Sequence, residues 1–161
     1  IRLRPFGRLT EAEFLEDWRI NVLGAVRVLQ ACQSALKKSP RGASVVLFSS
    51  VAVRTGLPFH ASIASAKGAV EGLARALAAE WAPRIRVNTI APSLTDTPLA
   101  AALLGDERRR QAAAERHPMQ RIGDPEEVAR LAVFLLEDPD SWTTGQVFHV
   151  DGGLSALPAS R

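Results

Sequence analysis

A serine pair and a lysine are the residues of this chain whose types and spacing best suit chemistry. Ser49 and Ser50 directly follow the apolar run 43–48, and Lys67 lies early in the helical pattern that comes next. A serine hydroxyl both donates and accepts hydrogen bonds, and a lysine ammonium only donates. A structural alternative exists for each, because strand-end serines often hold a loop and a lone helical lysine is usually solvated. Their spacing nevertheless predicts a ligand site shared by Ser50 and Lys67.

Two predicted strands and the helix between them determine where that site would lie. The run 43–48 holds three aliphatic residues in succession, which is typical of a strand buried on both faces of a parallel sheet. A helix is predicted over 61–81 and a second strand over 84–91. In open α/β sheets, ligands bind at the carboxyl ends of the strands. The chain is therefore predicted to be an α/β domain with its site at the end of strand 43–48.

Capping residues predict where two further helices begin. Thr10 and Glu13 form a capping-box pattern that opens a long helix. The apolar stripe of this helix comprises Phe14, Trp18, Val22, Ala25, Val26 and Leu29. Asp124 followed by Pro125 predicts the first turn of a later helix, and 147–150 predicts a last strand.

This arrangement resembles the short-chain dehydrogenase/reductase family, in which a strand-end serine is followed by a helix carrying a tyrosine and, one turn later, a lysine. With Ser50 and Lys67 in the serine and lysine positions, Ile63 occupies the tyrosine position. The chain contains no tyrosine, so no shift of the alignment restores one. Further matching positions are Trp18, Asn21, Asn88 to Pro92, Gly123 to Glu127, Thr144 to Gln146 and Asp151 to Gly153.

The resemblance implies a Rossmann-type, doubly wound parallel sheet, with residues 1–161 forming part of a single domain. It places Ile1 just after the family's Asn-Asn-Ala-Gly turn, so the first βαβαβ half with its glycine-rich phosphate loop is expected upstream. The family's mobile substrate lid corresponds to about 98–117, predicted here as two short helices hinged at Gly105. The apolar edge of the lid, expected to face an apolar substrate, comprises Leu99, Leu103 and Leu104.

The resemblance also implies a catalytic set of Asn21, Ser50 and Lys67. Ser50 would hydrogen-bond the substrate carbonyl or hydroxyl, and Lys67 would hold the ribose hydroxyls of the nicotinamide nucleotide. Asn21 would kink its helix and hold a water near Lys67. The alternative for Asn21 is a structural hydrogen bond to the backbone, because an unpaired buried amide costs about 1–3 kcal/mol.

A second set is implied to bind the nicotinamide. Pro92 keeps its place in the loop after strand 84–91, and the Leu94 backbone and the Thr97 hydroxyl would bind the carboxamide. Ser93 replaces the family's usual glycine and adds a side chain near the cofactor. The expected cofactor is NAD or NADP. The sequence does not distinguish the two, because the residues that do so follow the second strand of the fold, which is expected upstream of Ile1. No metal is expected.

Because tyrosine is absent, the sequence does not identify which group would donate the proton. Isoleucine neither donates nor accepts a proton, and general acid–base catalysis is worth about 10² to 10⁴ in rate. His60, Ser62 and Ser65 are nearby polar candidates, and imidazole titrates near neutral pH. The alternatives are a His60 that is merely hydrogen-bonded to the backbone, and a water held by Asn21, Ser50 and Lys67.

Two functions follow from these residues. The first is an NAD(P)-dependent oxidoreductase that acts on the carbonyl or hydroxyl of a small-molecule substrate, with an altered proton donor. The second is a dinucleotide-binding pseudoenzyme that serves as a structural or regulatory subunit. The small residues of helix 61–81 imply, by resemblance, a homodimer or homotetramer.

Composition excludes several other classes. Hydrophobic residues make up 47% of the 161 residues and charged ones 23%, as in ordinary globular proteins. The net charge of +3 comes from scattered basic residues without a stripe, so no nucleic-acid partner is expected. The single cysteine, Cys32, allows no internal disulfide and fits a reducing, cytoplasmic location. No apolar stretch reaches the roughly 20 residues of a membrane span.

Overall fold

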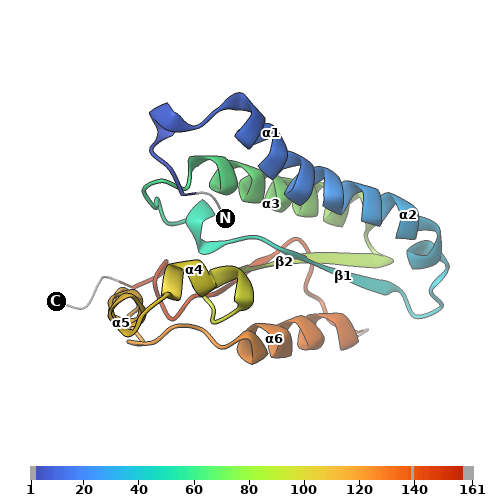
Figure 1. Cartoon of the computed structure of the whole chain (residues 1–161). Helices are drawn as coiled ribbons and strands as arrows, with labels where there is room; N and C mark the ends of the chain where they lie inside the picture. Colours follow the sequence, from blue (N-terminus) through green and yellow to red (C-terminus); the bar gives the residue numbers. More distant parts are fainter. Residues whose placement is uncertain (1–2, 139, 158–161) are drawn as a thin grey trace.

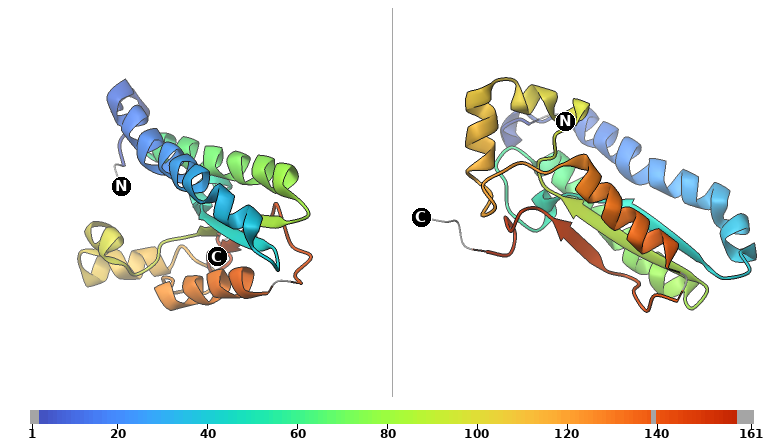
Figure 2. Two further views of the ribbon diagram at one scale, coloured as in Figure 1. Left: turned by 90° about the vertical axis from the view of Figure 1, so that its right-hand side faces the viewer. Right: turned by 90° about the horizontal axis from the view of Figure 1, so that it is seen from below.

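A parallel β-sheet flanked by helices on both faces forms the centre of the molecule. The computed structural model describes residues 3–138 and 140–157, whose strands β1 (Ala43–Phe48), β2 (Ile85–Pro92) and β3 (Val147–Val150) pair in that order. Helices α2 (Gly24–Lys38) and α3 (Ala61–Trp81) lie on one face and α6 (Pro125–Glu137) on the other (Figures 1 and 2). The predicted α/β class and parallel sheet are confirmed, and helices on both faces are the doubly wound arrangement.

Close packing of α3 on the sheet forms the core. Small side chains on the buried face of α3, among them Ala66, Ala74 and Ala78, let the helix approach the strands closely. The main cluster comprises Leu29, Val45, Ala74, Ala78, Trp81, Ile85 and Val87. β2 is the central strand, and six of its eight residues are buried, including the polar Asn88 and Thr89.

β1 is less covered than predicted. Only Val45 of this strand is buried, and Phe48 at its carboxyl end is 46% exposed. Within the described residues β1 is an edge strand that pairs with β2 alone. Helices lie on both faces of β1, but among the described residues only Val45 is buried, so burial along the whole run is not observed in this part of the protein.

The N-terminal helix begins as predicted but is not continuous. Thr10 accepts a hydrogen bond from the Glu13 N–H at 3.3 Å, and the Glu13 carboxylate accepts one from the Thr10 N–H at 2.9 Å. The α1 helix (Glu11–Trp18) then passes into a π-helical turn (Arg19–Leu23) before α2 begins. Trp18, predicted in the buried stripe, is 43% exposed, whereas Val22 and Leu29 are buried.

The lid region folds into the two short helices that were predicted, α4 (Ala101–Leu104) and α5 (Glu107–Ala114), after a 3₁₀ turn (Pro98–Ala100). Leu104 is buried in a small cluster with Ala100, Ala113, Leu94 and Ile122. Leu99, by contrast, is 70% exposed. Leu99 and Leu104 therefore do not form one exposed apolar edge, because Leu104 packs inward against Leu94 and Ile122, which lie outside this segment.

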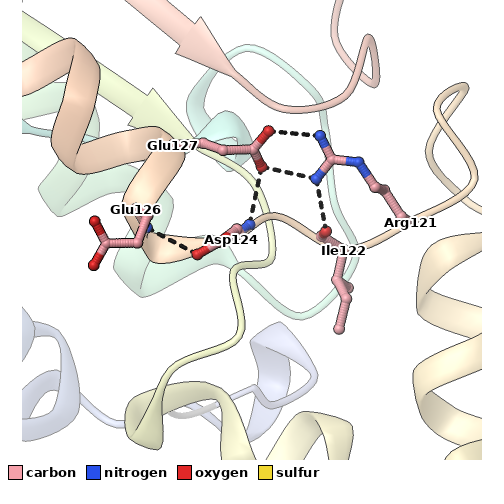
Figure 3. Close-up of polar contacts among 5 residues, drawn as sticks. All are labelled: Arg121, Ile122, Asp124, Glu126 and Glu127. Carbon is pink, nitrogen blue, oxygen red and sulfur yellow. Dashed lines mark hydrogen bonds and ion pairs between the residues drawn. The ribbon is translucent and has the colours of Figure 1, made fainter.

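The start of α6 is fixed by a compact polar network. Asp124 caps the helix by accepting from the Glu126 N–H at 2.9 Å, and the Glu127 carboxylate accepts from the Asp124 N–H at 3.1 Å. Arg121 forms a two-pronged ion pair with Glu127 at 2.6 and 2.7 Å (Figure 3). The Arg121 guanidinium and the Asp124 N–H lower the pKa of Glu127 to about 2.

We predict that Ile90→Ala costs about 2–5 kcal/mol in free energy of unfolding, because Ile90 is fully buried and its loss leaves a cavity between β2 and the helices. Urea denaturation of the purified protein measures the effect. The matched control is Ile20→Ala, since Ile20 is 59% exposed and truncating it should change stability by less than about 0.5 kcal/mol. Equal losses at both positions would contradict the assignment of the core.

Stability should also depend on Glu127 at acid pH. Folding lowers the pKa of this carboxyl from 4.5 to about 2, so its contribution is complete above pH 4.5 and disappears as the pH falls toward 2. Glu127→Gln should therefore flatten the acid-induced fall in melting temperature across that window. Glu126→Gln is the control, because the Glu126 carboxylate points away from Arg121 (Figure 3). An unchanged acid profile for Glu127→Gln would disprove the coupling.

Candidate functional site

The structure places Lys67 and Ser50 at the carboxyl end of β1. The Lys67 Nζ donates to the Phe48 carbonyl at 3.0 Å, two residues before Ser50. Ser50 caps a 3₁₀ turn (Val51–Val53), and its Oγ accepts from the Ala52 N–H at 3.2 Å. Because the end of β1 is open, both polar groups lie at the edge of the sheet where a ligand can reach them.

Burial changes the chemistry of Lys67. Its side chain lies partly within the protein between α3 and β1, and this burial lowers the pKa of the ammonium below its ordinary value. The Phe48 carbonyl is its hydrogen-bond acceptor, and an ammonium has further N–H groups to donate. Lys67 is therefore a hydrogen-bond donor held in place at the carboxyl end of β1, rather than a freely solvated charge.

A buried hydrogen bond holds this part of the site together. The Ser49 Oγ donates to the Glu71 Oε1 at 2.7 Å and lies 3.4 Å from the Lys67 carbonyl oxygen. The Ser49 N–H donates to the Ile90 carbonyl at 2.7 Å, so the same residue also joins β2. Sequence analysis missed Glu71, although a carboxylate on the otherwise apolar buried face of α3 was a readable signal.

Ile63 lies on α3 one turn before Lys67, and the nearby hydroxyls already have partners. The Ser62 Oγ donates to the Asp17 carboxylate at 2.6 Å and thereby ties α3 to α1. The Ser65 Oγ donates to the Ala61 carbonyl of its own helix at 2.7 Å. Each serine proton is thus already engaged in a structural hydrogen bond.

His60 precedes α3 and is held by the backbone. Its Nδ1 lies 2.7 Å from the Pro58 carbonyl oxygen, and because a carbonyl only accepts, Nδ1 carries the hydrogen. In the neutral ring Nε2 is then the basic nitrogen. The structural alternative for His60 is therefore observed, and Nε2 is the atom through which any proton transfer would pass.

Asn21 sits in the π-helical turn that separates α1 from α2. Its Nδ2 donates to the Asp17 carbonyl at 2.9 Å, so the structural hydrogen bond expected for this amide is present. The adjacent Val22 packs against Ala66 and Val70 of α3. The helix interruption thus lies against α3 at the level of Lys67, and single π-helical turns of this kind are frequent at functional sites.

The loop after β2 leaves the sheet at the same end as Ser50, because Phe48 and Ile90 are register partners. The Leu94 carbonyl accepts from the Gly123 N–H at 3.0 Å, and the Thr97 Oγ1 donates to the Thr95 carbonyl at 3.4 Å. Within the described residues the Leu94 N–H has no hydrogen-bond acceptor. Among the described residues, the Leu94 N–H is therefore available to a ligand.

A cavity of about 270 Å³ lies on the β3 side of this loop. Its lining includes Ser93, Leu94, His117, His149 and Asp151, but neither Ser50 nor Lys67. The cavity is consequently separate from the crevice at the end of β1. The part of the chain that the structure describes holds no cluster of three acidic, histidine or cysteine residues suited to a metal, and no helix able to cross a membrane.

Comparison with known proteins places these features in a family. The family model described as enoyl-(acyl carrier protein) reductase matches residues 2–155. A tropinone reductase homolog of Arabidopsis thaliana is 40% identical over 156 residues, which cover 96% of this chain and 59% of that protein. A protein of Xanthobacter autotrophicus named as an inactive 2-(S)-hydroxypropyl-CoM dehydrogenase is 38% identical and covers 94% of this chain and 69% of its own.

A solved structure gives the same result in three dimensions. The structure of ElxO with NADP bound superposes with a TM-score of 0.88 at 25% identity, covering 98% of this chain and 64% of that one. This chain therefore spans about 60% of the length of these relatives, and the element order, the sheet and the sequence similarity agree. The chain belongs to the short-chain dehydrogenase/reductase family.

Proposed function

We propose that the protein is an NAD(P)-dependent oxidoreductase acting on the carbonyl or hydroxyl of a small molecule. The observation that carries this proposal is the Lys67 ammonium, fixed at the carboxyl end of β1 beside Ser50 by its hydrogen bond to Phe48. A ribose diol needs such a donor, and a substrate oxygen needs a hydroxyl such as that of Ser50.

The residues present fit a nicotinamide nucleotide. The Leu94 N–H has no acceptor among the described residues, and an amide carbonyl of a cofactor would supply one. The Thr97 hydroxyl follows in the same loop, and Pro92 ends the strand beneath it. A bound nicotinamide would supply hydride transfer, while Lys67 and this loop would bind and orient it.

Proton transfer is the step for which this site is unusual. Ile63 offers no donor, and the Ser62 and Ser65 protons already have acceptors. The remaining routes are the His60 Nε2 and a water between Asn21, Ser50 and Lys67. Either source would have to protonate or deprotonate the substrate oxygen while Ser50 orients it.

The alternative is a dinucleotide-binding pseudoenzyme. Two observations favour it, namely the isoleucine at position 63 and the naming of one relative as inactive. We also expect a homodimer or homotetramer, because α3 exposes small residues such as Ser65, Gly72 and Ala76 against which a second backbone can pack. Both functions require cofactor binding, whereas only the first requires turnover.

Cofactor binding should depend on Lys67. We expect Lys67→Ala to weaken NADH or NADPH binding about 10- to 100-fold, because it removes a charged hydrogen-bond donor. Titration of the nicotinamide fluorescence measures this affinity in parent and variant. Lys38→Ala is the matched control, since Lys38 is exposed at the far end of α2. Equal affinity in parent and Lys67→Ala would remove the observation on which the proposed function rests.

Turnover should increase when a phenol is introduced at position 63. We expect Ile63→Tyr to raise carbonyl reduction by about 10² to 10⁴, because it adds a general acid one turn from Lys67. The control Ile63→Phe adds the ring without the hydroxyl and should give no gain. Steady-state rates with a panel of carbonyl substrates separate the two functions. An inert parent favours the pseudoenzyme, whereas a parent whose activity is abolished by His60→Ala is an enzyme with a replaced proton donor.

A further inference from the structure

A partly buried serine–histidine hydrogen bond joins the loop after β2 to the end of the lid. The Ser93 Oγ lies 2.8 Å from the His117 Nε2, and the His117 Nδ1 lies 2.8 Å from the Ala113 carbonyl oxygen. Because the carbonyl only accepts, Nδ1 carries the hydrogen, and in the neutral ring Nε2 accepts the Ser93 hydroxyl proton. Both ring nitrogens are therefore engaged, and His117 is only 4% exposed.

Two further contacts join the same segments. Arg110 of α5 forms a two-pronged ion pair with Asp96 at 2.7 and 3.3 Å, on the exposed side of the lid. Leu94 packs against the lid cluster that contains Leu104. The ion pair is exposed and screened by solvent, and the apolar contacts are non-directional. The Ser93–His117 bond, by contrast, is directional and involves a buried imidazole.

We propose that Ser93 and His117 form a latch that holds the lid, residues 98–117, against the loop of residues 93–97. Opening the lid requires this bond to break, which leaves a buried imidazole nitrogen without its donor until water reaches it. A glycine in place of Ser93 has no hydroxyl and cannot make the bond. The latch is therefore a property of the Ser93 side chain and not of the loop backbone.

The latch also positions a group of the proposed cofactor site. Ser93 directly precedes Leu94, and the Ser93 N–H donates to the Val150 carbonyl at 3.1 Å. Ser93 is thus held by β3 through its backbone and by the lid through its side chain, which leaves Leu94 little freedom. This positioning role rests on the proposed function, whereas the latch itself does not.

Lid opening is measurable without a substrate. Arg108 and Arg109 lie exposed within α5, so trypsin cuts them only when the helix opens, and hydrogen exchange of the α4 and α5 amides reports the same event. We expect Ser93→Ala and Ser93→Gly to accelerate both about 5- to 100-fold, because each removes the donor to the Nε2 of His117 and leaves that ring nitrogen unpaired. Ser34→Ala, an exposed serine of α2, is the matched control and should change neither rate.

A conservative variant separates the latch from general damage. His117→Gln keeps an amide within reach of Ser93 and should retain most of the lid protection, whereas His117→Ala should lose it. Lid rates equal to the parent in Ser93→Ala, Ser93→Gly and His117→Ala would overturn the proposal, and so would faster exchange spread evenly over the sheet as well as the lid.

Titration with NADH and NADPH in the same variants distinguishes this proposal from the function proposed above. A parent that binds neither nucleotide, but whose lid opens faster in Ser93→Ala, supports the latch and contradicts the cofactor site. A parent that binds nucleotide, with variants whose lid rates are unchanged, supports the cofactor site and overturns the latch. Weaker nucleotide binding together with faster lid opening supports both.

Discussion

The fastening of α3 to the carboxyl end of β1 is the constraint on which the site depends. Lys67 reaches the Phe48 carbonyl, and one turn further along the helix Glu71 holds the Ser49 hydroxyl. These two bonds tie the helix to the strand directly beside Ser50, which is half-buried. The small residues beneath them, such as Ala74 and Ala78, let α3 lie close enough to the sheet for the bonds to form.

Binding geometry and proton transfer are separated in this protein. The groups proposed to hold a cofactor and a substrate oxygen are a partly buried lysine, a strand-end serine and a Leu94 N–H that has no acceptor among the described residues. The position that would carry the proton donor holds isoleucine, and the neighbouring hydroxyls serve structural bonds. Such a frame can retain a ligand even where the chemical step is slow, because binding does not require the proton donor.

The loop of residues 93–97 follows β2. It is held by the β3 backbone on one side and by residues of the segment 98–117 on the other. The Arg121–Glu127 pair and the Asp124 cap fix the start of α6 (Figure 3). The Gly123 N–H donates to the Leu94 carbonyl and so joins that segment to the loop. Because several separate segments meet at this loop, its position responds to changes far from the crevice in sequence.

Local signals in the sequence determined the elements. The run 43–48, the helix 61–81 and the caps at Thr10 and Asp124 lie where they were predicted, because periodicity and capping act over a few residues. Residue types and spacing pointed to Ser50 and Lys67, and family resemblance added the roles expected for them and the expected cofactor. Only the tertiary structure decided the Ser49–Glu71 and Ser93–His117 pairs, the inward turn of Leu104 and the open end of β1. These features depend on which segments meet in space, and a single sequence carries no periodic signal for such distant pairs.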